Sequence, residues 1–532
     1  MKHSGIPFSI GRALSAILDE SLCNRTRSIA QRRAFHEYFV THLPSSSLSP
    51  DKQSTPHGLP RSDSAPHAGP TRSAARLAPS AASRDTTIVR IPIRSAKHHF
   101  GAGVSRGSRP YNEDTFQAGT IEIPAFAKRQ PVSLSRRLSG SNGEVGGEAA
   151  RSESGDPQVF YFGVFDGHGG SECSEFLRER LHGYVEEAAL LFGMESSLQS
   201  GNAMEDSEGG VMGEQDAEDL QKSLVSSWRE TVGGYFKRFR PEYFPAVADR
   251  RSPGTSWSQN NNSIETVLSY AFLKADLDFT AAQASKHSAD TATLQVSSLD
   301  DPRSRRGSSP DLQAPIGGAQ RFKGGSTASI ALISTPTSMP FWHPASPSTF
   351  ISAHVGDTRI LLCRSSDGKA VPTTINHHPS HPVEATRLRR YAAAFVADSF
   401  GEERMGGLAN TRAFGDISSK RMGVSAEPQI TRLELSAAEY SFIVLMSDGI
   451  SGHLSDQEVV DVVKEAKTPA QAAESLISFA TETAESADNA TALVVRLGGW
   501  ERRNEGGGGS MGTREQREYR LQEAQDPRSR RQ

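Results

Sequence analysis

The sequence predicts a fold of the α+β class, in which antiparallel β-sheets are covered by helices. Strand-like segments follow one another through short turns, and the helical segments stand apart from them instead of alternating with them one by one. Strict alternation would favour a parallel sheet, whereas this order favours antiparallel pairing. The apolar run 158–166 has the length and density of a buried strand. Turns at Gly356-Asp357 and Asp367-Gly368 divide 351–375 into a predicted meander.

Helix signals occur at four places outside the predicted strands. Apolar residues recur on one helical face over 177–188 and again over 264–279, where Ser263 is placed to cap the helix. Residues 455–458 form a capping-box pattern, and Thr468-Pro469 puts proline at the first position of a further helix. These helices are expected to cover the sheets.

The chain of 532 residues is only 36% apolar, which is too little for a sequence folded from end to end. Residues 1–96 are interpreted as a transit peptide followed by a linker, and 97–499 as one catalytic domain. The tail 500–532 is interpreted as flexible and charged. Long polar loops cost little stability, so three polar stretches inside the domain are interpreted as surface insertions. They lie near 127–155, 193–218 and 285–320.

Charge and cysteine usage narrow the classes of partner and environment. The net charge of −3 gives no reason to expect nucleic acid as a partner. The three cysteines, Cys23, Cys173 and Cys363, have no zinc-ligand spacing and predict no disulfide framework. No apolar run is long enough to span a bilayer, so no transmembrane span is expected. We also expect a monomer.

The N-terminal segment has the composition of a mitochondrial targeting sequence. Ile6, Ile10 and Leu14 recur at helical spacing, and the segment to about residue 33 is rich in arginine and serine and poor in acidic residues. The sequence therefore predicts a mitochondrial protein, in the matrix or the intermembrane space. The alternative is an ordinary basic leader on a cytoplasmic protein.

Acidic residues stand repeatedly at the ends of predicted strands, beside glycine or asparagine. They are Glu113, Asp114, Asp166, Asp357, Asp448 and Asp488. One such aspartate is ordinarily a turn residue, so only the set is informative. Carboxylate oxygens without a Cys/His cluster suit hard cations such as Mg²⁺ or Mn²⁺ and not zinc. The glycines after Asp166 are not followed by the Gly-Lys-Ser/Thr of a phosphate-binding P-loop.

Seven short segments stand out, in this order along the chain: Arg109-Pro110-Tyr111-Asn112-Glu113-Asp114, Phe165-Asp166-Gly167-His168-Gly169-Gly170, Gly324-Gly325-Ser326-Thr327-Ala328, Val355-Gly356-Asp357-Thr358-Arg359, Leu408-Ala409-Asn410-Thr411-Arg412-Ala413-Phe414-Gly415-Asp416, Ser447-Asp448-Gly449-Ile450 and Asp488-Asn489. Taken together, they resemble the motifs of the type 2C metal-dependent protein phosphatases, and the resemblance extends from about residue 98 to 498. The fourth segment is expected to be a hairpin.

The resemblance implies two stacked antiparallel sheets flanked by helices, with two Mg²⁺ or Mn²⁺ ions in a cleft at one end of the sandwich. It implies hydrolysis of phosphoserine and phosphothreonine in phosphorylated protein substrates. Asp166 would bridge both ions, and Glu113 and the Gly167 carbonyl would help to bind one of them. Asp448 and Asp488 would bind the other.

The resemblance also implies roles beyond the two main ions. Arg109 would hold the substrate phosphate, His168 would donate a proton to the leaving alkoxide, and Asp114 would orient waters. Asp357 and Asp448 would bind a weaker third ion, whose occupancy is in question because Gly452 stands where the family often has aspartate.

A second departure is Asn376-His377-His378-Pro379, where the family commonly has Asp-His before Lys-Pro. The resemblance places this stretch in a mobile flap beside the cleft, so an altered substrate preference is expected. A phosphorylated mitochondrial enzyme such as the pyruvate dehydrogenase complex is the expected substrate.

Two other classes of protein remain open. One is an inactive relative that serves as a docking module, although Glu113, Asp166, Asp448 and Asp488 are all present. The other is a metal-dependent nuclease or phosphodiesterase, which would need a basic groove.

Overall fold

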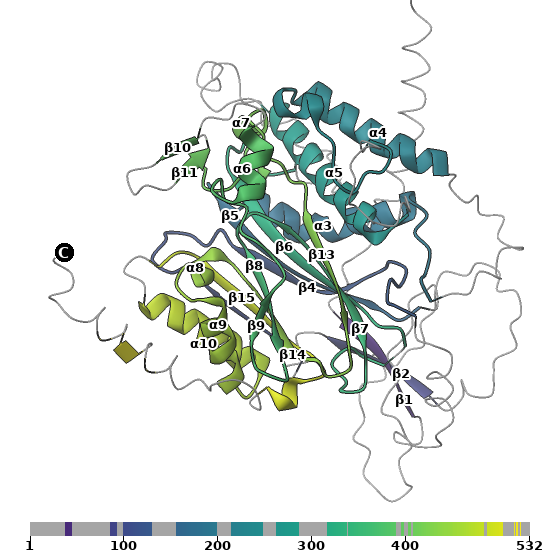
Figure 1. Cartoon of the computed structure of the whole chain (residues 1–532), viewed down its shortest axis with the longest axis vertical. Coiled ribbons are helices and arrows are strands. Elements are labelled where there is room, and N and C mark those ends of the chain that lie inside the picture. The colour runs from purple at the N-terminus through teal and green to yellow at the C-terminus, as the bar shows by residue number, and fades with distance from the viewer. Residues whose placement is uncertain are drawn as a thin grey trace, which may run out of the picture.

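The computed structural model contains two antiparallel β-sheets stacked face to face, with helices on their outer faces (Figure 1). The residues it describes are 99–129, 156–198, 214–247, 262–286, 316–337, 339–389, 408–483 and 487–503, the short strands 38–44, 86–92, 395–397 and 403–405, and residues 515, 518, 519 and 522 of the tail. The predicted α+β class and the two-sheet arrangement are confirmed.

Each sheet is antiparallel throughout. The first sheet has the strand order β13 (Gln429–Leu435), β7 (Ser348–Val355), β6 (Gly325–Ser334), β5 (Val159–His168) and β4 (Thr115–Ile121), and the short β12 (Phe414–Gly415) pairs with β6. The second has the order β3 (Phe100–Ser105), β15 (Ala490–Arg496), β14 (Tyr440–Met446), β8 (Arg359–Arg364) and β9 (Ala370–Pro372).

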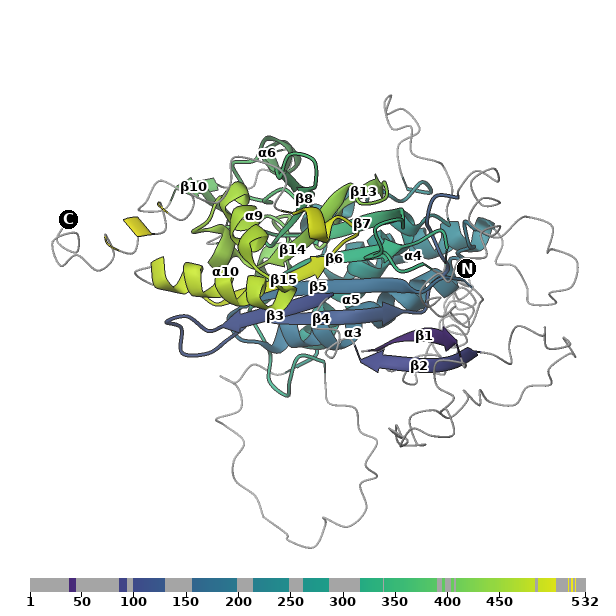
Figure 2. The ribbon, with the colours of Figure 1, turned by 90° about the horizontal axis from the view of Figure 1, so that it is seen from below.

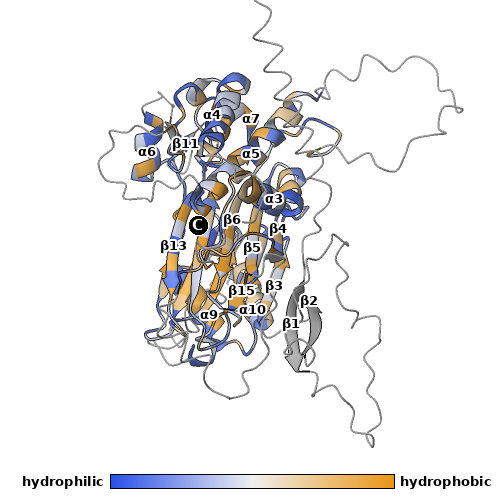
Figure 3. Ribbon diagram, turned by 90° about the vertical axis from the view of Figure 1, so that its right-hand side faces the viewer, coloured by the Kyte–Doolittle hydropathy of each residue, from blue (hydrophilic) through white to orange (hydrophobic). Residues whose placement is uncertain are grey.

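Strand β5 shows how the sequence builds the layers, because successive side chains of a strand point to opposite faces. Phe160, Phe162 and Val164 pack between the sheets, whereas Tyr161 and Phe165 face the helices. Both faces are buried, which is why the run is apolar without alternation. In Figure 3 hydrophobic residues follow the strands, and the outer helices carry hydrophilic ones.

Helices α3 (Glu172–Leu191), α4 (Glu214–Thr231) and α5 (Ile264–Ala284) share a core with the first sheet, and α9 (Asp456–Glu465) and α10 (Pro469–Thr483) share one with the second. The predicted helix starts are confirmed. The Ser263 hydroxyl accepts a hydrogen bond from the Thr266 N–H, and Ser455 and Glu458 form a complete capping box. None of the helices among the described residues has the length and apolar character needed to cross a bilayer.

The predicted meander over 351–375 is wrong in its first half. β7 pairs with β6 and β13, whereas β8 pairs with β14 and β9 in the other sheet. The segment between β7 and β8 is therefore a crossing between sheets and not a hairpin, although the β8–β9 hairpin around Asp367-Gly368 is present. Gly356 permits the crossing, since its φ is +105° and a Cβ would lie 2.3 Å from the Thr327 side chain.

A segment that follows β9 contributes α6 (Pro382–Arg389), the paired strands β10 (Phe395–Ala397) and β11 (Glu403–Met405), and α7 (Ile417–Lys420). We call residues 376–389 and 408–424 of this segment the flap. In Figures 1 and 3 α6 and α7 both lie beyond the upper end of the sheets.

Most of the predicted terminal segments and insertions, including the amphipathic N-terminal stretch, fall outside the described residues. Within 1–96, strand β1 (Tyr38–Pro44) pairs with β2 (Thr86–Pro92), in a region interpreted from sequence as a linker (Figure 2). At the other boundary, Trp500 in the 3₁₀-helix η7 (Trp500–Arg502) is buried in the helix-side core of the second sheet. Folded structure therefore continues past residue 499.

Candidate metal centre

The acidic residues predicted from sequence meet at one end of both sheets. Thr115 pairs with Phe165, so Asp114 and Asp166 lie next to each other at the ends of β4 and β5. Met446 pairs with Ala492, which puts Asp448, after β14, at the same end as Asp488, before β15. Asp357 lies in the crossing from β7 to β8.

Three of these carboxylates converge closely. Asp166, Asp357 and Asp448 each offer an oxygen, and the three oxygens lie within 4.8 Å of one another. Burial, together with the negative charges of Asp448, Asp114 and Asp357, raises the pKa of Asp166 well above its usual value. Burial and the charges of Asp357 and Asp488 raise the pKa of Asp448 to about 7. Mutually repelling, half-buried carboxylates of this kind fit a hard divalent cation, which would compensate their charge.

Asp114 lies beneath this group and is 5% exposed. Its Oδ2 accepts a hydrogen bond from the Ser447 hydroxyl at 2.7 Å, and that hydroxyl in turn accepts from the Thr491 N–H at 2.9 Å. The Asp114 Oδ1 atom is buried and has no hydrogen-bond partner. Burial raises the pKa of Asp114 to about 6 even though Ser447 and Thr491 oppose the shift. The unpaired oxygen is a further sign that the site is built to contain polar atoms beyond those of the chain.

Glu113 is held by the loop that follows Asp166. Its Oε1 accepts a hydrogen bond from the Gly170 N–H at 2.8 Å, and its carbonyl accepts one from the Ser174 hydroxyl at the start of α3. A Cβ at Gly167 would lie 2.5 Å from the Glu113 carbonyl oxygen, so this close approach requires glycine.

Hydrogen bonds from the Asn489 side chain hold the loop that contains Arg109 and Glu113 in place. The side-chain amide of Asn489 donates to the carbonyls of Arg106 and Tyr111, and its Oδ1 accepts from the Glu113 N–H at 2.8 Å. Arg109 makes an ion pair of 2.7 Å with Asp488, and its side chain is 57% exposed. The Arg109 guanidinium therefore lies at the surface beside the acidic group.

His168, at the end of β5, contacts a buried aspartate. Its Nε2 lies 3.0 Å from both carboxylate oxygens of Asp416, and the two side chains are 39% and 6% exposed. Burial lowers the pKa of His168, but the hydrogen bond and charge of Asp416 outweigh that effect, so the pKa is raised above its ordinary value. A raised pKa favours the protonated imidazole that a proton donor needs.

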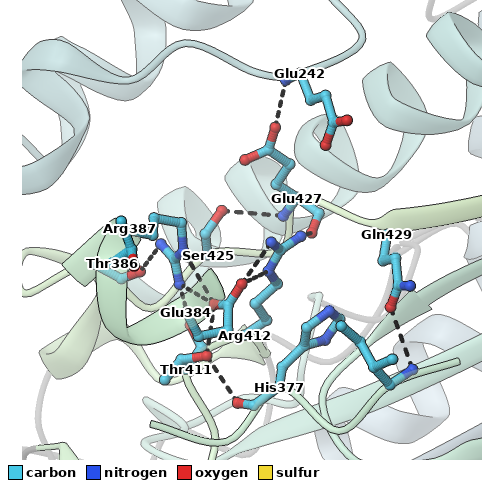
Figure 4. Close-up of polar contacts among 12 residues, drawn as sticks. Glu242, His377, Glu384, Thr386, Arg387, Thr411, Arg412, Ser425, Glu427 and Gln429 are labelled. Carbon is cyan, nitrogen blue, oxygen red and sulfur yellow. Dashed lines mark hydrogen bonds and ion pairs between the residues drawn. The ribbon is translucent and has the colours of Figure 1, made fainter. Parts of the chain in front are cut away.

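The flap is joined to the sheets by a buried charge cluster, drawn in Figure 4. Glu384 of α6 is fully buried and accepts hydrogen bonds from both Arg387 and Arg412. Burial would raise the pKa of Glu384, but the two guanidinium groups lower it to about 2. Arg412 also donates to the Glu427 carbonyl. Arg412 therefore connects Glu384 in the flap to the segment that leads into β13. Although Arg412 lies in one of the motif segments, its contacts are structural.

Two flap residues contact the crossing that carries Asp357. The Gly356 N–H donates to His377 Nδ1 at 3.0 Å, and the His377 N–H donates to the Gly356 carbonyl at 2.9 Å. Asn410 donates from its side-chain amide to Asp357 Oδ2 at 2.8 Å. His377, in the stretch that the resemblance places in a flap, is thus buried and bonded to the metal-site turn.

The structure brings every residue predicted from sequence to this end of the sheets. Asp166, Asp357 and Asp448 form the closest group, and Glu113, Asp114 and Asp488 lie around it. Sequence reasoning assigned no role to several residues that hold them in place. These are Asp416, Ser447, Asn489, Asn410 and Glu384. Of these, Asp416, Ser447, Asn489 and Asn410 stand inside recognised motif segments, which was the available signal. Glu384 had none.

Comparison with known proteins agrees with this arrangement. A family model described as Protein phosphatase 2C matches residues 255–489. The chain is 35% identical over 417 residues to "Protein phosphatase 2C homolog 4" of Schizosaccharomyces pombe, and the alignment covers 78% of this chain and 84% of that protein. It is 35% identical over 181 residues to "Protein phosphatase 1K, mitochondrial" of Xenopus laevis, which covers 33% of this chain and 44% of that one.

Among solved structures, "Crystal structure of serine-threonine phosphatase 2C from Toxoplasma gondii" aligns with a TM-score of 0.42 at 15% identity, covering 75% of this chain and 94% of that chain. The family assignment rests on the relative from Schizosaccharomyces pombe, because the similarity extends over most of both proteins. The chain belongs to the protein phosphatase 2C family and is a metal-dependent protein serine/threonine phosphatase.

Proposed function

We propose that the chain hydrolyses phosphoserine and phosphothreonine in proteins at a centre of two Mg²⁺ or Mn²⁺ ions. The observation that supports this most is the convergence of Asp166, Asp357 and Asp448 at the ends of two sheets, with His168 following Asp166 by two residues. All three groups offer only oxygen, which suits these ions.

The residues divide into two overlapping ligand sets. Asp166, Glu113 and the Gly167 carbonyl would hold one ion, and Asp166, Asp448 and Asp488 the other. Asp357 and Asp448 would hold a weaker third ion, for which Gly452 contributes no carboxylate. When bound, the ions supply Lewis-acid stabilisation of the phosphoryl oxygens and a water acidic enough to act as nucleophile.

Three further residues act on the substrate and its surroundings. Arg109 presents an exposed guanidinium fork that matches two phosphate oxygens, and its pairing with Asp488 fixes its direction. Asp114 offers the unpaired Oδ1 atom to orient a water. His168 gives its proton to the serine or threonine oxygen as the P–O bond breaks, because an alkoxide is a poor leaving group without protonation.

Activity on a phosphothreonine peptide is expected to require added Mg²⁺ or Mn²⁺ and to disappear in EDTA. The clustered carboxylates are negatively charged and cannot stabilise the reacting phosphate themselves. Metal ions bound between them would supply positive charge in addition to that of Arg109. The measurement is phosphate release by protein that has been stripped of metal and then titrated with each ion. Okadaic acid is the matched control and should leave the rate unchanged. Full activity in stripped protein would refute the metal mechanism.

We place the protein in mitochondria, with a phosphorylated mitochondrial enzyme such as the pyruvate dehydrogenase complex as substrate. The support is the arginine-rich, acid-poor N-terminal segment. A relative named "Protein phosphatase 1K, mitochondrial" adds to it.

A fusion of residues 1–40 to a fluorescent protein is expected to enter mitochondria, because Ile6, Ile10 and Leu14 recur at helical spacing in an arginine-rich, acid-poor segment. Microscopy with a mitochondrial dye measures it. The control is the same fusion with these three residues changed to aspartate, which should stay in the cytosol. Diffuse signal from the unchanged fusion would reject the targeting role without affecting the catalytic proposal.

A further inference from the structure

The contact between His168 and Asp416 joins two segments that are far apart in the sequence. The Nε2 atom of His168 lies 3.0 Å from each carboxylate oxygen of Asp416. In the described part of the chain, the hydrogen bonds of the His168 ring all involve Nε2, which leaves Nδ1 for a substrate. The histidine is 39% exposed and the aspartate 6%, so one partner reaches solvent and the other is fixed inside.

Asp416 has an unusual backbone conformation that sets the direction of its carboxylate. Its φ is +44°, in the left-handed region that residues other than glycine seldom adopt. Its N–H donates to the Gly324 carbonyl at 2.9 Å, next to the strand pair formed by Gly415 and Gly325. A Cβ on Gly325 would lie 2.5 Å from Asp416 Oδ2, so the carboxylate occupies space that only glycine leaves open.

A buried ion pair fixes the loop on the N-terminal side of Asp416. Asp276 of α5 and Lys420 of α7 are fully buried and lie 2.5 Å apart. Asp276 accepts a second hydrogen bond from the Gly415 N–H at 2.9 Å, and Lys420 donates to the Ala413 carbonyl at 2.7 Å. Burying two charges is costly unless their partners are in place. Here those partners are the backbone groups on the N-terminal side of Asp416, so the pair fixes the loop that presents it.

We propose that Asp416 is a positioning residue for His168, which it orients so that the proton of Nδ1 faces the leaving oxygen of the substrate. The proposal rests on the function proposed above and adds a residue to it. The Asp416 carboxylate accepts the hydrogen on Nε2. As the P–O bond breaks, the proton on Nδ1 passes to the serine or threonine oxygen, and the imidazole is left neutral, still bonded to Asp416 through Nε2–H.

Asp416→Asn tests the proposal, because asparagine tolerates the left-handed conformation and keeps the size of the side chain. A phosphothreonine peptide leaves as a basic alkoxide, whereas p-nitrophenyl phosphate leaves as a weakly basic phenolate. Turnover of the peptide is expected to fall by about 10- to 100-fold, and that of p-nitrophenyl phosphate by no more than about 3-fold. Asp367→Asn, in the β8–β9 turn, is the matched control and should change neither rate.

A double-mutant cycle separates positioning from mere support of the fold. In the His168→Asn background, adding Asp416→Asn should cause little further loss on the peptide, because the two residues act as one unit. Calorimetric titration with Mn²⁺ should give the same affinity for the single Asp416 variant as for the unchanged protein. Equal losses on both substrates, weaker Mn²⁺ binding or additive effects would overturn the positioning role. If His168→Asn itself treats both substrates alike, the proton-donor role fails and the role of Asp416 fails with it, while metal-dependent hydrolysis stands.

Discussion

Asp166→Ala and Asp448→Ala are each expected to lower turnover of a phosphothreonine peptide by about 10³-fold or more. Metal ions contribute several kcal/mol of transition-state stabilisation, and each ~1.4 kcal/mol corresponds to a factor of ten in rate. Asp166 and Asp448 belong to the group whose oxygens lie within 4.8 Å of one another, so removing either one removes a ligand from the centre. Steady-state kinetics at saturating Mg²⁺ or Mn²⁺ measures the loss.

The same variants should keep their fold and melt at a higher temperature than the unchanged protein when metal is removed. Burial and neighbouring carboxylates raise the pKa of Asp448 to about 7. A carboxyl whose folded-state pKa lies above its unfolded value destabilises the folded protein when it ionises, so the cost grows as the pH rises toward 7 and is fully present above it. The increase in melting temperature from Asp448→Ala should therefore be larger at about pH 8 than at about pH 5.

Asp367→Ala serves as the control for this pair, since Asp367 lies in the exposed β8–β9 turn. It should change neither the rate nor the difference in melting temperature between the two pH values. Near-normal turnover by Asp166→Ala or Asp448→Ala would contradict the assignment of the metal centre. A lower melting temperature at both pH values would instead show that the two aspartates support the fold.

The sequence predicted the local features of the fold well, because local features depend on neighbouring residues. The caps at Ser263 and Ser455 follow from spacing and residue type alone, as does the strand predicted at 158–166, which the structure has at Val159–His168. Sheet membership was harder to predict. A short turn between two apolar strands normally signals a hairpin, yet the segment through Gly356 crosses between sheets. A β7–β8 hairpin cannot form because β6 and β13 occupy both edges of β7. The residues of β13 lie far from β7 in the sequence, so the local pattern does not reveal this pairing.

The metal ligands could be predicted because they stand in recognisable order along the chain, but the residues that hold them could not. Glu384 has the sequence context of an ordinary exposed helix residue. Only the folded structure shows that Arg387 and Arg412 meet at it in a buried site. Asp416 similarly follows a glycine as a turn residue would, and its contact with His168 bridges 248 positions. Partnerships of this kind leave no local pattern in one sequence.

His168→Asn is expected to lower turnover of a phosphothreonine peptide by about 10²- to 10⁴-fold, the usual contribution of general acid catalysis. Turnover of p-nitrophenyl phosphate should change far less, because its phenolate leaves without protonation. The alternative role for His168 is structural. It ends β5 two residues after Asp166 and pairs with Gly325, so it contributes to the turn that carries the metal-binding aspartate.

The two roles differ in what they predict for metal binding and for the two substrates. A structural His168 would shape the Asp166-Gly167 turn, so its loss should weaken Mn²⁺ affinity and slow both substrates equally. A proton donor should leave Mn²⁺ affinity close to normal and affect the peptide selectively. The exposed ring, hydrogen-bonded through Nε2 to the buried Asp416, favours the donor. His343→Asn, in the loop before β7, is the matched control for loss of a histidine and should leave both rates unchanged. Parallel losses on the two substrates, together with weaker Mn²⁺ binding, would assign His168 to the structure of the turn, because a missing proton donor cannot slow a reaction whose leaving group needs no proton.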